Sequence, residues 1–339
     1  MPVYSIDPYP LRAGRIYNPD TFVSIWDTTK TSTGSSNDNQ IKLPLVSGGT
    51  YNFYVDWGDG TANTITAYNQ AEVTHTYNYS GVYTIMITGT LTGFKFNNSG
   101  DRLKLLRVVN WGRNFCWGNA ANVFYSCSNL IITALDALNL TGITTFQGLF
   151  SYCENLVSIP NINNWNVSAI TLMHYMFANC TKFNQNLNNW NTANVTAMAS
   201  MFNGDTVFNQ DISAWNTGNV TDMSGMFQNA KAFNQNIGGW NTSKVANMSN
   251  MFNGATAFNQ NLGSWNIGNL TNATNMFINK QLSTANYDAL LIGWAAQAPN
   301  INNGVPFHGG TSKYSDAAVA ARNTLTSTYG WIITDGGHV

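Results

Sequence analysis

The sequence has little charge and no catalytic motif, and these absences exclude several classes of function. Only 9% of the 339 residues are charged, and the net charge is −1. A nucleic-acid partner is not expected, because such proteins usually carry a basic stripe. No Gly-x-Ser-x-Gly, His-Glu-x-x-His or phosphate-binding glycine loop occurs, and the histidines are far apart. We therefore expect a protein that is not an enzyme and has no cofactor.

Long apolar runs are also missing from the sequence. No segment approaches the roughly 18 apolar residues of a membrane-spanning helix, so membrane insertion is not expected. Residues 1–8 lack the basic segment and apolar core of a signal peptide. The uncharged polar surface is nevertheless typical of extracellular proteins. Together these features predict a location on a virion, or on a cell surface if a secretion signal lies outside this chain.

What the sequence does contain is a repeat with a period of 25 residues. The tryptophans of this repeat are Trp165, Trp190, Trp215, Trp240 and Trp265. Met-Phe pairs keep the same step from Met176-Phe177 to Met276-Phe277. A fixed period of 20–50 residues is the mark of stacked repeats, and this one lies in the range of leucine-rich repeats.

Each repeat predicts three local structures. In residues 208–213, Phe208 and Ile212 alternate with polar residues, as in a half-buried strand. A bend near Ala214 and a turn at residues 216–219 follow. Residues 223–230 then have the apolar spacing of one helical face. Stacking should join the strands into one parallel sheet over a column of aromatic side chains.

The sequence has four cysteines and no Cys-x-x-Cys pair. Cys127, Cys153 and Cys180 occupy equivalent positions in successive repeats, where later repeats carry Asp205, Ala230 and Ala255. The main interpretation is a column of small buried side chains. A disulfide between adjacent repeats is the alternative.

A different pattern precedes the repeats. Residues 1–20 are predicted to form an extended arm, and residues 21–93 a β-domain. The turn Val55-Asp-Trp-Gly-Asp-Gly-Thr61 and the segment His75-Thr-Tyr77 resemble the PKD domain, which implies an immunoglobulin-like β-sandwich. Asp56 and Asp59 could bind Ca²⁺. We favour the alternative that both carboxylates accept backbone N–H bonds within the turn, with no metal.

The repeats resemble the BspA-like leucine-rich-repeat family of bacterial surface proteins. The likeness rests on Trp215-Asn-Thr-Gly-Asn-Val-Thr-Asp-Met-Ser-Gly-Met-Phe227, and extends to the bridge Asn97–Asp101 and the segment Tyr287–Trp294. The expected fold is mainly β with short helices. It comprises a PKD-like β-sandwich, a leucine-rich-repeat solenoid over residues 94–282 and a C-terminal α/β cap over residues 283–339. The resemblance implies a non-enzymatic role in adhesion or recognition.

If Phe208 and Ile212 point inward, the polar residues beside them form the outer, concave face of the sheet. The candidate ligand-binding residues are Asn184, Asn186, Asn209, Asp211, Asn234, Asn236, Asn259 and Asn261. They could instead bond only to one another and to water. The same assignment of inward and outward side chains also places four glutamines in the interior, where each would need hydrogen bonds. They are Gln185, Gln210, Gln235 and Gln260.

The leading functional hypothesis is a virion structural protein, of the tail or capsid, that binds a host-surface protein or glycan. Residues 1–20 would attach it to the particle. The alternatives are a bacterial cell-surface adhesin of the BspA-like type and a glycan-binding module. The sequence leaves the ligand and the oligomeric state open.

Overall fold

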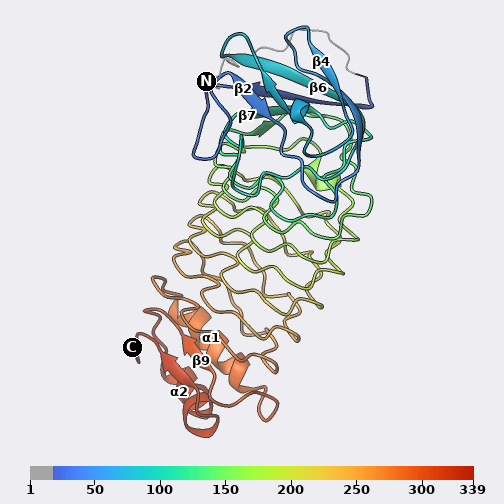
Figure 1. The fold of residues 1–339 in the computed structure, drawn as a ribbon. Helices are drawn as coiled ribbons and strands as arrows, with labels where there is room; N and C mark the ends of the chain where they lie inside the picture. The colour runs from blue at the N-terminus through green and yellow to red at the C-terminus, as the bar shows by residue number, and fades with distance from the viewer. Residues whose placement is uncertain (1–17) are drawn as a thin grey trace.

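The computed structural model of the chain describes residues 18–339 and is elongated (Figure 1). An N-terminal β-region lies at one end, and a small α/β region lies at the other. Between them is a pile of regularly spaced backbone turns, which we call the stacked array (residues 111–283). The predicted arm, residues 1–20, lies outside the described residues except for its last three.

The N-terminal region is built on a six-stranded mixed sheet. Its order is β4 (Ala62–Ile65), β3 (Tyr51–Asp56), β6 (Val82–Leu91), β1 (Thr21–Asp27), β7 (Leu105–Asn110) and β8 (Ile131–Ile132). β1 pairs antiparallel with both β6 and β7, and β7 pairs parallel with β8. The sheet therefore continues past residue 93 into the first turns of the stacked array.

A second, two-stranded sheet pairs β2 (Gln40–Lys42) with β5 (Thr74–Thr76), which follows the 3-10 turn η1 (Ala71–Val73). Fully buried Trp26, Trp57 and Tyr77 are among the aromatic residues of the core in this region. The core is continuous with that of the stacked array, because Phe94 and Trp111 both contact Phe124. The N-terminal region and the array thus share one hydrophobic core.

Beyond β8, the repeats of the stacked array are held together by hydrogen bonds one repeat apart, without extended strands. Single parallel bridges join Thr145 to Leu172, Leu172 to Ala197, and so on to Asn247 and Asn272. In a typical repeat, the N–H groups of Met223 and Phe227 donate to the next repeat, at 3.0 and 2.9 Å. The N–H of Met226 instead donates to the carbonyl of Met223 at 3.2 Å. The segment is therefore a series of turns that alternates internal and inter-repeat bonds.

The expected leucine-rich-repeat fold class is wrong, although the mainly β character is confirmed. Residues 208–213 form no strand and residues 223–230 form no helix. Apart from the short 3-10 turn η2 (Ile162–Asn164), no helix or strand occurs between β8 and α1. Mixed sheets and single bridges replace the expected sandwich and continuous parallel sheet.

Left-handed backbone conformations explain why the apolar spacing misled the helix prediction. Gly225 and Asn229 have φ values of 58° and 58°, which interrupt any right-handed helix at residues 223–230. Successive repeats place two such residues four positions apart. The pairs are Asn122 and Ser126, Gly148 and Tyr152, Tyr175 and Asn179, Ser200 and Gly204, Gly225 and Asn229, Asn250 and Gly254, and Asn275 and Asn279.

The tryptophan column lies in the core, as the 25-residue step predicted. Trp215 is 3% exposed and stacks on Trp190 with ring centroids 6.1 Å apart. Its Nε1 donates to the carbonyl of Leu187 at 3.0 Å, and Trp240 and Trp265 make the equivalent bonds. Each ring therefore fills the core and also ties its repeat to the preceding one.

The C-terminal region covers the last repeat. It contains α1 (Thr284–Ala295), β9 (Pro306–His308), α2 (Asp316–Asn323), the π-turn η3 (Thr324–Thr328) and β10 (Ile332–Thr334). The N–H of Phe277 donates to His308 in β9 at 3.0 Å. Trp294 in α1 donates to the carbonyl of Leu262 at 3.2 Å, and so continues the bonding pattern of the tryptophan column. Residues 283–339 thus contain both helices and strands.

The cysteine column is also confirmed as small buried side chains. Cys127, Cys153 and Cys180 are free thiols with no exposed surface. The Sγ atoms of Cys153 and Cys180 donate to the carbonyls of Phe124 and Phe150, at 3.1 and 2.9 Å. The next residue in this column is Asp205, which is equally buried.

Candidate functional site

The predicted ligand-binding residues do lie together, on what we call the asparagine face. It consists of Asn184, Asn186, Asn209, Asp211, Asn234, Asn236, Asn259 and Asn261, all exposed or half-buried. Because residues 208–213 are not a strand, this face is not the concave side of a sheet. It is formed by two columns of polar side chains on consecutive turns.

The first column links successive repeats through its side chains. The Oδ1 atom of Asn184 accepts from the N–H of Asn209 at 3.0 Å, and Asn209 accepts in the same way from Asn234 at 2.9 Å. Gln235, half-buried, donates to the same Oδ1 of Asn209. The Nδ2 groups of this column donate no hydrogen bond within the described residues. Ligand binding by this column stays a prediction, and its acceptor atoms already stabilise the stack.

The second column stabilises its own repeats. Asp211 accepts from the N–H of Ser213 at 2.9 Å, and Asn236 accepts from Gly238 at 3.0 Å. These are turns closed by a side chain two residues back, a common use of Asn and Asp. The hydrogen bond from Ser213 also holds the pKa of Asp211 below its usual range.

The turn at Asp56 and Asp59 has partners for its carboxylates within the chain. Asp56 accepts from Gly58 at 2.9 Å, and Asp59 accepts from the N–H of Thr61 at 3.0 Å and pairs with His75 at 2.8 Å. Burial alone would raise the pKa of Asp59, but the bonds from Thr61 and His75 outweigh it and lower this pKa. Within residues 18–339, no three His, Cys, Asp or Glu side chains gather in a group that could bind a metal.

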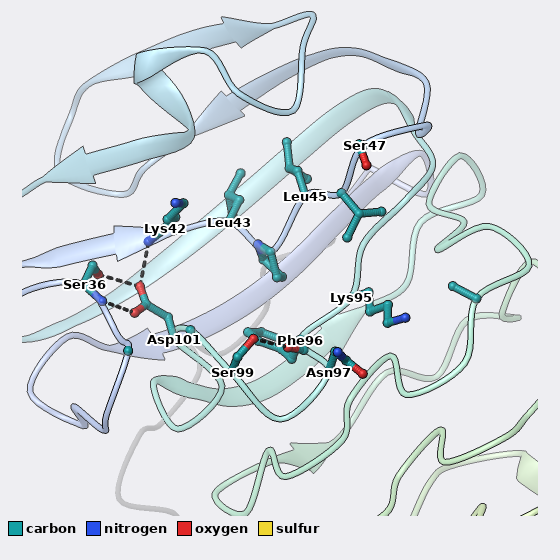
Figure 2. Close-up of a pocket in the computed structure, with 15 residues that line it drawn as sticks. Ser36, Lys42, Leu43, Leu45, Ser47, Lys95, Phe96, Asn97, Ser99 and Asp101 are labelled. Carbon is teal, nitrogen blue, oxygen red and sulfur yellow. Dashed lines mark hydrogen bonds between the residues drawn. The ribbon is translucent and has the colours of Figure 1, made fainter.

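A groove of about 640 Å³ lies where the N-terminal region meets the first turn of the array (Figure 2). Asp101 closes one end of it, and the carboxylate accepts from the N–H groups of Ser36 and Lys42, each at 2.7 Å. Buried Lys104 lies 3.4 Å from Asp101 and donates to the carbonyls of Asn37 and Gln40. Burial lowers the pKa of Lys104, although Asp101 opposes the shift. These charges have partners within the N-terminal region, so they stabilise that region.

A smaller hollow of about 330 Å³ lies on the array itself, and we call it the tyrosine hollow. Its lining residues are Asn122, Tyr125, Gln147, Gly148, Ser151, Tyr152, Tyr175, Ala178, Asn179 and Asn203. The rings of Tyr125 and Tyr152 lie 5.7 Å apart at 43°. Tyr152 and Tyr175 are 42% and 48% exposed, so a large part of each aromatic side chain stays in contact with water.

Both exposed tyrosines occupy left-handed backbone positions. The φ values are 59° at Tyr152 and 56° at Tyr175, a conformation that is a genuine outlier for a bulky residue. Other repeats place Asn, Ser or Gly at these two positions, as at Asn179, Ser200 and Gly225. Local conformational preference therefore does not account for tyrosine there.

The hollow also contains amide side chains without internal partners. Gln147 and Asn179 are half-buried, and their side chains make no hydrogen bond to any described residue. Their polar atoms are not among the buried atoms that lack a partner, so they can bond to water or to a ligand. No charged residue is among those that line the hollow.

Sequence reasoning missed the tyrosine hollow, although the signal was present. The two positions that carry Gly or Asn in the regular repeats carry Tyr152 and Tyr175 in the early ones. A bulky side chain replacing Asn or Gly in a repeat marks a local departure from the requirements of the fold.

The histidines do not form a common site. His338 pairs with Asp316, whereas His174 is half-buried in the array.

One protein-family model matches the stacked array. A family model described as "Mycoplasma protein of unknown function, DUF285" matches residues 118–205 and 187–290, together just over half of the chain. The chain belongs to this family. The matched residues include nearly the whole array, the asparagine face and the tyrosine hollow. No curated protein and no solved structure matches the chain.

Among the described residues, no helix combines the length and the apolar character needed to cross a bilayer.

Proposed function

We propose that this protein is a non-catalytic recognition protein, whose ligand binds to the stacked array at the tyrosine hollow. The observation that supports this most is the pair Tyr152 and Tyr175, exposed and held at positive φ. Strained residues of this kind cluster at active sites and ligand-binding positions. Tyrosine is also among the residues that contribute most to binding energy at interfaces.

We further propose that the protein acts at a surface, as a virion structural protein or as a cell-surface adhesin. The scarcity of charge and the resemblance to BspA-like surface proteins support this role. A rigid array is suited to it, because each repeat adds length without requiring a new core. Attachment through residues 1–20 stays a prediction. Deleting those residues should release the protein from its particle without unfolding residues 21–339.

The proposed site can be tested by binding of the fluorescently labelled protein to intact host cells. The double variant Tyr152→Asn, Tyr175→Asn installs residues that other repeats already carry at these positions, namely Asn179 and Asn250. Cell binding should fall to background. Tyr79→Ser is the matched control, because Tyr79 is 80% exposed and lies outside the hollow.

A second variant tests the asparagine face in the same assay. Asn189→Lys, Ala214→Lys and Gly239→Lys add charge and bulk beside it, one repeat apart, at exposed positions. None of the three removes a side-chain hydrogen bond, and a Cβ at Gly239 meets no atom within 4 Å. Binding should persist. Loss of binding here, with full binding by the tyrosine variant, would move the site to the asparagine face.

A further inference from the structure

We infer that the ligand of the tyrosine hollow is an uncharged oligosaccharide. This rests on the proposed function and specifies the chemical class of its ligand. The hollow combines exposed aromatic rings, amide groups without partners and a lining free of charge. Each of these three features selects for one property of a neutral sugar.

The aromatic rings match the apolar face of a sugar ring. A pyranose presents a flat face of C–H groups, which packs on the π-face of an aromatic side chain. Tyr125 and Tyr152 lie 5.7 Å apart with their planes at 43°, and Tyr175 lies on the next repeat. The hollow therefore offers successive aromatic surfaces along the stack, as a chain of linked sugar units requires.

The unpaired amides match the hydroxyl groups around the edge of a sugar. An amide side chain carries one acceptor oxygen and two donor N–H groups, and a hydroxyl both donates and accepts. Gln147 and Asn179 are the lining amides whose side chains make no bond within the described chain. Two others are already in use, because Asn122 donates to Asn97 and Asn203 donates to Gln228. Bound hydroxyls would supply the partners that Gln147 and Asn179 lack.

The uncharged lining argues against an acidic ligand or a charged peptide. A buried carboxylate, sulfate or phosphate needs a cation or several donors to offset its lost hydration. No Lys, Arg or His lines the hollow. At about 330 Å³, the hollow is at the lower end of the range for small-ligand sites, so it suits a short oligosaccharide segment.

The test uses the full-length protein on a printed array of neutral and acidic oligosaccharides. The wild type should bind neutral members and no member whose only added feature is a carboxylate or sulfate. Tyr152→Asn, Tyr175→Asn should weaken binding to the same members by about tenfold or more, the usual effect of removing tyrosine anchors. Tyr152→Phe, Tyr175→Phe should retain binding, because the ring faces remain. Tyr79→Ser should bind as the wild type does.

Each other outcome overturns a defined part of the inference. Binding to acidic members alone would refute the neutral class. Binding to neutral members that the Asn variant retains would refute the site. If no member binds, while binding to cells still depends on Tyr152 and Tyr175, the saccharide class fails and the proposed function stands. If binding to cells is also independent of both tyrosines, both proposals fail.

Discussion

The early and the later repeats of the array share one backbone but differ in the side chains it carries. In the later repeats, the left-handed positions hold residues that adopt positive φ at low cost, such as Gly225, Asn229 and Gly254. In two of the early repeats, one of these two positions holds a tyrosine instead, at Tyr152 and at Tyr175. The cysteine column changes its residues at the same place along the array, from Cys180 through Asp205 to Ala230. The comparison fits the proposal that the early repeats give up some stability for a binding site, while the later repeats carry residues suited to the turns.

The largest effect should come from the shared core of the regular repeats. Trp215→Ala removes a ring that stacks on Trp190 and Phe202 and bonds to Leu187. We expect a loss of roughly 3–5 kcal/mol in the free energy of unfolding, the usual cost of truncating a buried large aromatic. Denaturant unfolding measures this. A melting temperature within a degree of the wild type would show that the tryptophan column is not essential to the core.

The next largest effect should come from a left-handed position in the turns, a backbone feature that both sets of repeats share. Gly254 has φ of 72°, and a Cβ there would lie 2.4 Å from Oδ1 of Asn229 in the preceding repeat. Gly254→Ala should therefore lower the free energy of unfolding by roughly 1–2 kcal/mol, the cost of a left-handed residue with a side chain. Gly239→Ala is the control, because Gly239 has no positive φ and no atom within 4 Å of its added Cβ. Equal effects of the two substitutions would contradict the account of the turns.

Buried Asp205, at the boundary between the early and the later repeats, should make the stability of the folded protein depend on pH. Burial raises the pKa of Asp205 well above its ordinary value of 3.8, although the N–H groups of Val207 and Phe208 oppose the shift. Neither carboxyl oxygen makes a hydrogen bond of ordinary geometry within the described chain. The folded state thus holds a proton that the unfolded state releases above pH 3.8. Stability from this group is complete below that pH and is lost as the pH rises toward the folded-state pKa.

Asp205→Ala installs the residue that Ala230 and Ala255 place in the same column. Its melting temperature should exceed that of the wild type at pH 7, and the difference should shrink as the pH falls toward 4. Thermal melts at several pH values test this. A difference that stays constant, or grows toward low pH, would mean that Asp205 is not held protonated.

The smallest effect is expected in the N-terminal region. The carboxylates of Asp56 and Asp59 already accept bonds from Gly58, Thr61 and His75. We therefore predict that a chelator leaves the melting temperature unchanged. A large drop that added Ca²⁺ reverses would show that the turn binds a metal.

The sequence alone predicted the elements whose signal is local. The β character of residues 21–93 and the burial of the tryptophan column both follow from residue patterns. The conformation of the repeat was mispredicted, because residues 223–230 have the apolar period of a helix. That period arises instead from turns whose alternate N–H groups bond to the next repeat. Only the regular return of Gly and Asn at residues such as Gly225 and Asn229 could have indicated this.

The candidate site was harder to predict than the fold. The asparagine face was visible as a regular column, but regularity in a repeat reflects bonds between repeats, as at Asn209. The tyrosine hollow is irregular, since it joins side chains from repeats that differ in sequence. Its exposure and its backbone strain are properties of the three-dimensional structure. The site that we propose therefore rests on a departure from the repeat and not on the repeat itself.

The central claim is that Tyr152 and Tyr175 serve a ligand and contribute nothing to folding. The most direct test is the free energy of unfolding of Tyr152→Asn, Tyr175→Asn, measured by denaturant unfolding without ligand. The account predicts a value equal to or above that of the wild type, because Asn tolerates positive φ better than tyrosine. A loss of more than about 1 kcal/mol, the scale of an ordinary destabilising substitution, would contradict it and make the tyrosines part of the fold.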